Sequence, residues 1–109
     1  MLTTDDPLLL RERDVRGVVT LTLNRPQAFN ALSEAMLDAL QTELDLLAAD
    51  DGVRVLVIGA SGKAFCAGHD LKEMRAEPAL DYYERLFAQC ARMMLSIQRL
   101  PVPVVAKVQ

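Results

Sequence analysis

Residues 62–74 form the segment of this sequence that is best suited to chemistry. They follow a short β-branched run at 53–58, which is typical of a buried strand, and they pass through small residues into a polar, helix-like start. The N–H groups that begin a helix have no partner within it. Where Ala67 and Gly68 leave the main chain uncovered, such groups can donate to a negatively charged oxygen. The pattern indicates a site for a carbonyl whose oxygen becomes anionic during reaction.

On spacing alone, a turn of small residues after a buried strand more often reflects close packing than chemistry. The side chains beside it leave alternatives open as well. Asp70 fits a carboxylate at a helix N-terminus better than a catalytic base. Cys66 and Cys90 are most simply buried thiols in a reducing compartment. A nucleophilic Cys66 is the alternative, but His69 is the only histidine that could activate it.

Three stretches in a fixed order carry a resemblance to a known family. They read TLTLNRPQAFNALS at 20–33 (with NRPQAFNAL at 24–32), AFCAGHDL at 64–71 and LPVPVVAKV at 100–108. In this order they resemble the enoyl-CoA hydratase/isomerase (crotonase) superfamily, from about Leu8 to Gln109. The resemblance implies an α/β, crotonase-like spiral of ββα units. Residues 1–109 would form an incomplete N-terminal segment of one such domain, with about four to five strands and two to three helices.

The resemblance also implies part of an acyl-CoA-binding enzyme that stabilises the enolate oxyanion of a thioester with two backbone donors. Here one donor would be the backbone N–H of His69. In the family, the second donor and the acid and base carboxylates come later than the strand at 104–108. We therefore expect the chain to be part of a longer polypeptide and to be inactive alone. A non-catalytic CoA-ester-binding or scaffold member of the superfamily is the alternative, and an unrelated small α/β domain is the third possibility.

The residues expected near the CoA arm are small or lie beside the helix start, and most would act through backbone atoms: Ala28, Ala31, Ala67, Gly68, His69, Asp70, Leu71 and Lys72. The His69 imidazole could fill the acyl pocket or add a hydrogen bond. Arg25 and Lys63 are conceivable phosphate contacts or simply solvated cations. No separate cofactor or metal is expected, because coenzyme A would be part of the substrate. The resemblance implies a homotrimer or hexamer for the full-length protein.

The elements that position this segment follow from patterning. A hairpin is predicted from 8–13 and 18–23, and a helix from an N-cap at Ser33 to about residue 50. The strand at 53–58 should then run parallel to the second hairpin strand. A long amphipathic helix and a strand at 104–108, unpaired along one edge, complete the prediction. The helix is expected to bury Leu80, Tyr83, Leu86, Phe87, Cys90, Met93, Met94, Ile97 and Leu100. Residues 75–78 are linker-like, and Lys72 and Glu73 are expected on a solvated face.

The composition is that of one globular domain. The 109 residues are 51% hydrophobic and 25% charged with a formal net charge of −3, which excludes a disordered class and lacks the basic excess of nucleic-acid binders. No apolar run approaches the roughly 20 residues of a membrane span, and the first residues lack the features of a signal peptide. These observations predict a cytoplasmic protein with neither nucleic acid nor membrane as a partner.

Overall fold

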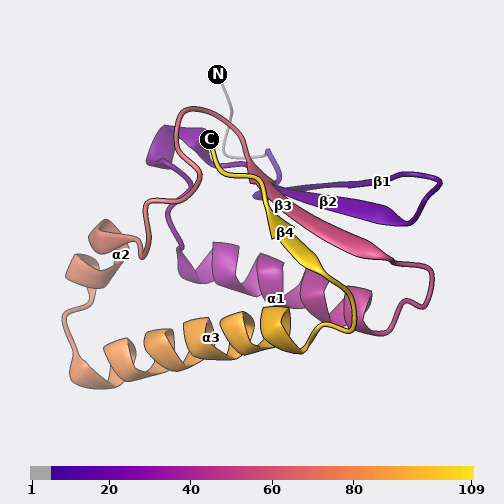
Figure 1. Cartoon of the computed structure of the whole chain (residues 1–109). Coiled ribbons are helices and arrows are strands. Elements are labelled where there is room, and N and C mark those ends of the chain that lie inside the picture. Colours follow the sequence, from indigo (N-terminus) through magenta and orange to yellow (C-terminus); the bar gives the residue numbers. More distant parts are fainter. Residues whose placement is uncertain (1–5) are drawn as a thin grey trace.

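The computed structural model describes residues 6–109, whose strands form one four-stranded sheet in the order β1-β2-β3-β4 (Figure 1). Strands β1 (Leu9–Arg13) and β2 (Val18–Leu23) pair antiparallel. In the turn between them the Asp14 carboxylate accepts from the amides of Arg16 and Val18, and Gly17 adopts a φ of 85°. That left-handed conformation favours glycine. The predicted hairpin is confirmed.

Strands β3 (Val55–Ala60) and β4 (Val104–Ala106) extend the sheet with parallel pairing. The predicted parallel pairing of β2 and β3 is confirmed, but β3 lies two residues further along than 53–58. The reason is the register, because pairing begins with Val18 opposite Val55 and continues until Leu23 meets Ala60. Strand β4 is shorter than predicted and forms one edge of the sheet, as expected.

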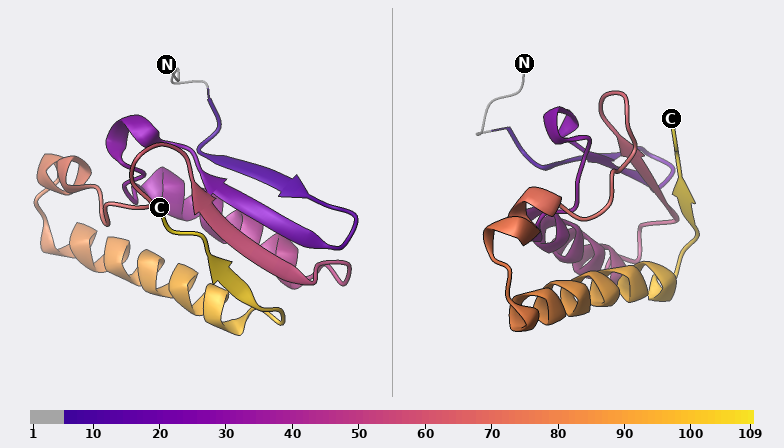
Figure 2. Two further views of the ribbon diagram at one scale, coloured as in Figure 1. Left: turned by 45° about the horizontal axis from the view of Figure 1, so that its top comes forward. Right: turned by 90° about the vertical axis from the view of Figure 1, so that its left-hand side faces the viewer.

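Helices α1 (Glu34–Ala48) and α3 (Leu80–Arg99) cover one face of the sheet (Figure 2). The Ser33 hydroxyl accepts from the Met36 amide at 3.1 Å, so the predicted N-cap of α1 is confirmed. Between β3 and α3 lies the short helix α2 (Leu71–Ala76), which includes part of the segment predicted to be a linker. A single 3-10 turn, η1 (Pro26–Ala28), follows β2.

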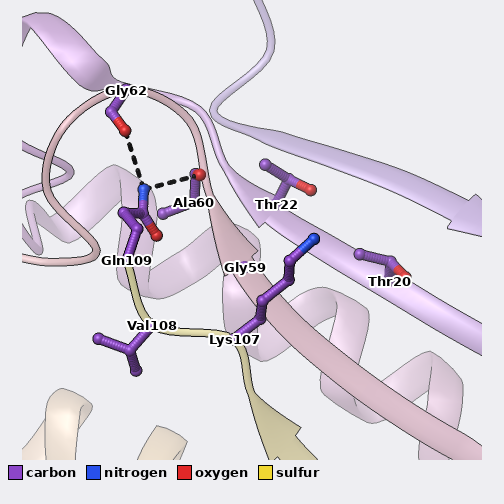
Figure 3. Close-up of a pocket in the computed structure, with 8 residues that line it drawn as sticks. All are labelled: Thr20, Thr22, Gly59, Ala60, Gly62, Lys107, Val108 and Gln109. Carbon is purple, nitrogen blue, oxygen red and sulfur yellow. Dashed lines mark hydrogen bonds between the residues drawn. The ribbon is translucent and has the colours of Figure 1, made fainter.

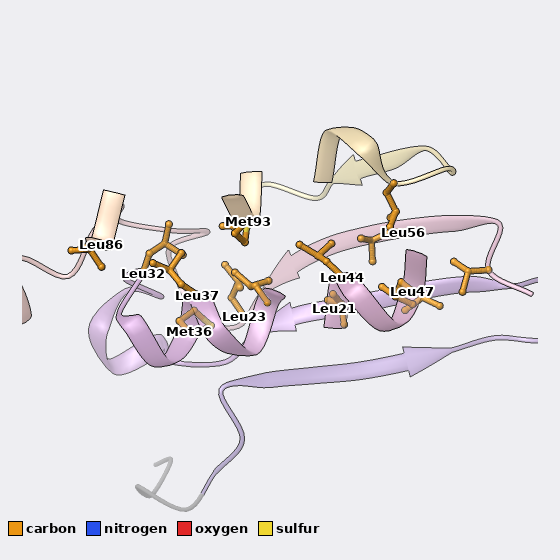
Figure 4. Packing of buried hydrophobic residues seen from close by; sticks show 14 of the residues in the cluster. Leu21, Leu23, Leu32, Met36, Leu37, Leu44, Leu47, Leu56, Leu86 and Met93 are labelled. Atoms are coloured by element: carbon orange, nitrogen blue, oxygen red, sulfur yellow. The ribbon is translucent and has the colours of Figure 1, made fainter. Parts of the chain in front are cut away.

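The core lies between this sheet face and the two helices (Figure 4). Alternate residues of β2 point into it, and α1 contributes one apolar face: Met36, Leu37, Leu40, Leu44 and Leu47. Helix α3 differs from the prediction, because Tyr82, Leu86 and Met93 are its buried residues, whereas Leu80 is 73% exposed and Phe87 and Met94 are also exposed. Its apolar face is broader than its contact with α1, and helical periodicity does not say which side of such a face is covered.

The cysteines also differ from the prediction, since both are only half-buried. Each packs against the edge of the core, and burial raises the pKa of the Cys90 thiol. The opposite face of the sheet is more polar. It bears a pocket of about 440 Å³ that includes Thr20, Thr22 and Lys107 (Figure 3). There the Gln109 amide donates to the carbonyls of Ala60 and Gly62 at 3.0 Å.

Neighbouring residues of β3 provide a test of which face carries the core. Leu56 has no exposed surface, whereas Val57 is half-buried on the opposite face. We expect Leu56→Ala to lower the free energy of unfolding by about 2–5 kcal/mol, because it removes buried methyl groups and leaves a cavity. Val57→Ala should cost less. Denaturant titration of both variants measures the difference, and equal losses would contradict this assignment.

Candidate functional site

A pocket of about 330 Å³ lies between the turn after β2 and the segment that leads into α2. Its walls contain every residue predicted from the sequence to lie near the CoA arm, except Gly68. The residues that line it are Arg25, Gln27, Ala28, Phe29, Ala31, Ala67, His69, Asp70, Leu71 and Lys72. Gln27 and Phe29 were not predicted as site residues, although both lie within the motif at 24–32. Lys63 is exposed and does not line this pocket.

The two walls meet at an isolated parallel bridge between Leu32 and His69. The Leu32 amide donates to the Gly68 carbonyl at 2.7 Å, and the Asp70 amide donates to the Leu32 carbonyl at 3.3 Å. In a parallel pair of this pattern, the N–H of the residue opposite Leu32 points away from Leu32. The His69 amide accordingly finds no acceptor among residues 6–109. It is a backbone donor with free hydrogen-bonding capacity beside the pocket.

Gly68 shapes the backbone rather than the pocket wall. Its φ is 89°, which strains any residue with a side chain, although a Cβ placed there would meet no atom within 4 Å. The requirement for glycine therefore comes from conformation and not from crowding. Because this turn directly precedes His69, it helps to set the direction of the His69 amide.

The His69 imidazole contacts helix α3. Its ring meets the Phe87 ring in an edge-on arrangement, with centroids 5.2 Å apart. Its Nδ1 atom is buried and has no hydrogen-bond partner in the described part of the chain. The helical spacing predicted Phe87 to be in the core. Phe87 is instead exposed and packs against the His69 ring. The side chain of His69 links the site to α3, while its backbone N–H remains without an acceptor.

Asn30 fixes the turn that carries the first wall. It has no exposed surface and a φ of 55°, a left-handed conformation that asparagine tolerates better than most residues. Its Oδ1 accepts from the Arg25 amide at 2.7 Å, and its Nδ2 donates to the carbonyls of Ser61 and Ala64 at 2.9 Å. This role was not predicted from the sequence. The only local signal was an asparagine in a turn, and such asparagines are also common in turns whose side chains make no long-range hydrogen bonds.

Asp70 caps α2 and pairs with Arg25. One carboxylate oxygen accepts from the Glu73 amide at 3.2 Å, and the other accepts from Arg25 Nη1 at 2.9 Å. The Arg25 guanidinium, followed by the Glu73 amide, lowers the pKa of the Asp70 carboxyl against the opposing effect of burial. Asp70 is therefore ionised at neutral pH and is poorly suited to accept a proton. Much of the Arg25 charge is compensated by this pair, which makes Arg25 a weaker phosphate contact than a free cation.

A second, apolar groove of about 340 Å³ lies between α3 and the sheet. Leu32 and Cys66 line this groove, while their chain neighbours Ala31 and Ala67 line the pocket described above. The two cavities therefore lie on either side of the bridged segments. Within residues 6–109 no group of three or more His, Cys, Asp or Glu side chains is arranged to hold a metal ion, and no described helix is long and apolar enough to span a membrane.

The amide of Asn30 can be tested by an isosteric change. In Asn30→Asp the Nδ2 donor becomes an oxygen that faces the carbonyls of Ser61 and Ala64. We expect a loss of at least about 3 kcal/mol in the free energy of unfolding, because a buried charge is brought against two acceptors. Gln27→Glu makes the same chemical change at an exposed position of this turn and should stay within about 0.5 kcal/mol of wild type. Similar losses in both variants would refute the role of Asn30.

The Arg25–Asp70 pair should make stability depend on pH. The pKa of Asp70 is lower in the folded than in the unfolded protein, so its charge stabilises the fold above the ordinary aspartate pKa of about 4. This contribution is lost as the pH falls through the lowered pKa. Asp70→Asn keeps a capping side chain and removes only the charge. The difference in unfolding free energy between wild type and Asp70→Asn should therefore shrink below about pH 4. The exposed Asp81→Asn is the control, and a difference that is independent of pH would contradict the pair.

Known proteins with similar sequences and structures identify the family of this chain. The family model described as enoyl-CoA hydratase/isomerase matches residues 18–109. The crystal structure of an enoyl-CoA hydratase from Mycobacterium smegmatis superimposes with a TM-score of 0.94 and 71% identity, over 94% of this chain and 40% of that one. The fold predicted from the sequence, the N-terminal part of a crotonase-like α/β domain, is confirmed by this likeness.

Two curated relatives correct the predicted location. Enoyl-CoA hydratase domain-containing protein 3 from Xenopus laevis is 42% identical over 102 residues, and the human protein of the same name is 38% identical over 103 residues. Each comparison covers 94% of this chain and 34% of the relative, so the chain spans about a third of their length. Both are named mitochondrial, which contradicts the prediction of a cytoplasmic protein. Location depends on targeting segments that are separate from the fold, so the composition of a domain does not reveal it.

The match to the family model extends over most of the chain and includes both walls of the pocket. All of the motifs on which the resemblance was based lie within the matched residues. The chain belongs to the enoyl-CoA hydratase/isomerase family.

Proposed function

We propose that this chain provides the CoA-binding part of an acyl-CoA hydratase or isomerase, and that the His69 amide donates to the thioester carbonyl oxygen. The observation that carries the proposal is that this amide has no acceptor within the described residues and belongs to a residue that lines the 330 Å³ pocket. A fixed backbone donor stabilises an enolate oxyanion without reorganising during the reaction.

The pocket suits a ligand that contacts the main chain closely. Ala28, Ala31 and Ala67 add only methyl groups to its walls. The apolar groove across the bridged segments offers a place for an acyl chain, with the thioester near the bridge itself. In this proposal the CoA arm lies along Ala28, Ala31 and the 67–72 wall. Coenzyme A enters as part of the substrate, and no further cofactor is included.

The proton-transfer groups of the reaction are proposed to lie outside residues 6–109. Asp70 is the only carboxylate that lines the pocket among the described residues, and its pairing with Arg25 makes it a poor acid or base. We therefore propose that residues 1–109 alone do not hydrate enoyl-CoA substrates. A homotrimer or hexamer of the full-length protein stays a prediction from the family resemblance.

Replacing His69 separates its main chain from its side chain. His69→Ala keeps the N–H, whereas His69→Pro removes it. In the complete gene product, we expect the alanine variant to lose no more than about tenfold in the rate of crotonyl-CoA hydration. The proline variant should lose on the order of a hundredfold or more, as for loss of one oxyanion donor.

Circular dichroism and acetyl-CoA binding must be measured alongside, because proline could also distort the loop. An alanine variant that folds, binds acetyl-CoA and is as inactive as the proline variant would assign the chemistry to the imidazole instead. Tight binding of acetyl-CoA by wild type without turnover of enoyl-CoA substrates would favour the non-catalytic alternative.

A further inference from the structure

Helix α2 forms part of the pocket wall but has little hydrophobic anchoring. None of its residues is buried, and Leu71, which lines the pocket, is 65% exposed. Met74 alone packs partly against the core among the side chains of α2. The position of this wall must therefore depend largely on polar contacts.

Within residues 6–109, three contacts made by side chains hold α2, each to a different part of the fold. At its N-terminus Asp70 pairs with Arg25, and near its C-terminus the Tyr83 hydroxyl donates to the Met74 carbonyl at 3.1 Å. The third contact comes from the middle of the helix. Glu73 Oε1 accepts from the backbone amide of Glu34 at 2.8 Å. Glu73 is thus half-buried against α1 and not on the solvated face that its sequence position indicated.

The Glu34 amide is a favourable partner for a carboxylate. It belongs to the first residue of α1, where N–H groups have no acceptor within the helix and the helix dipole attracts negative charge. The Ser33 hydroxyl is used by the Met36 amide, so it does not serve Glu34. A hydrogen bond from an amide to a charged carboxylate is also stronger than a neutral one.

This bond joins the same two segments as the bridge between Leu32 and His69. Two residues beyond Leu32 is Glu34, and four residues beyond His69 is Glu73. Ala31, which lines the pocket, directly precedes Leu32. Leu71 and Lys72, which also line it, lie between His69 and Glu73 in the sequence. The Glu73–Glu34 bond thus adds a side-chain contact to the Leu32–His69 bridge, the Arg25–Asp70 pair and the bond from the Ala67 amide to the Phe29 carbonyl, which also join the two walls.

We infer that Glu73 is a positioning residue which, by accepting the Glu34 amide, holds α2 against the start of α1 and so helps to set the separation of the pocket walls. Glu73 does not line the pocket and acts only through this contact. The inference rests on the proposed function to the extent that it takes a CoA thioester as the ligand of the pocket.

The two ends of this bond can be removed separately. Glu73→Ala deletes the acceptor, and Glu73→Gln keeps an oxygen at the same reach. Glu34→Pro deletes the donor at the first position of α1, where proline is well tolerated. Ser33 before it has φ −74° and ψ 166°, the extended conformation that a following proline requires. Glu77→Ala, an exposed glutamate just after α2, is the matched control.

The readouts are amide hydrogen exchange at Glu34 and the Kd for acetyl-CoA, measured in the complete gene product. We expect Glu73→Ala to speed exchange at Glu34 about tenfold and to raise the Kd about tenfold, while Glu73→Gln and Glu77→Ala stay within about threefold of wild type. Glu34→Pro should raise the Kd as much as Glu73→Ala does. Adding Glu73→Ala to Glu34→Pro should then change little, because the bond is already absent.

Unchanged exchange at Glu34 in a folded Glu73→Ala variant would overturn the inference. Faster exchange with an unchanged Kd would also overturn it, because Glu73 would then be only structural. Should Glu73→Ala fail to fold, the Kd of Glu34→Pro decides. If wild type fails to bind acetyl-CoA, the proposed function fails by itself, and exchange at Glu34 still decides whether Glu73 contacts α1.

Discussion

The buried amide of Asn30 is the interaction on which the candidate site depends most. It is the point at which the turn after β2 and the loop after β3 are joined by side-chain hydrogen bonds to the backbone of both. The Leu32–His69 bridge and the bond from the Ala67 amide to the Phe29 carbonyl join the same two segments. A backbone donor can be aimed with accuracy only if the loop that carries it cannot relax. Asn30 supplies that rigidity, although it does not line the pocket itself.

The elements of the fold were accessible from the sequence because their signals are local. Alternation of apolar residues in β2, the N-cap at Ser33 and the helical spacing of leucines in α1 each report the conformation of their own segment. The errors arose where tertiary contacts decide. Strand β3 lies two residues later than the predicted 53–58, because register with β2 sets its ends. The buried residues of α3 differ from those predicted, because α1 covers only part of a broad apolar surface.

In the candidate site, too, local sequence signals and tertiary contacts differ in how far they can be predicted. The residues chosen from the family resemblance lie around one pocket, because their motifs lie at the ends of the neighbouring strands β2 and β3. The contacts that hold it were not predicted. Glu73 follows Lys72 in what looks like an ordinary charged helix face, and only the three-dimensional structure brings its carboxylate to the start of α1. Polar side chains that act on the backbone of distant residues leave no periodic pattern in a sequence.

The parallel pairing of β2 and β3 has a further consequence for how the pocket comes into being during folding. One wall extends from the end of β2 and the other from the end of β3, and the two halves of the Leu32–His69 bridge are separated by a whole helix and a strand. Contacts of such long sequence separation require closure of the intervening chain, which costs conformational entropy and makes them slow to form. A chain that has formed its hairpin and helices but has not yet aligned these strands has no pocket. Any ligand of this pocket would therefore bind only to molecules that have completed the sheet, and its binding would stabilise that completed state over its precursors.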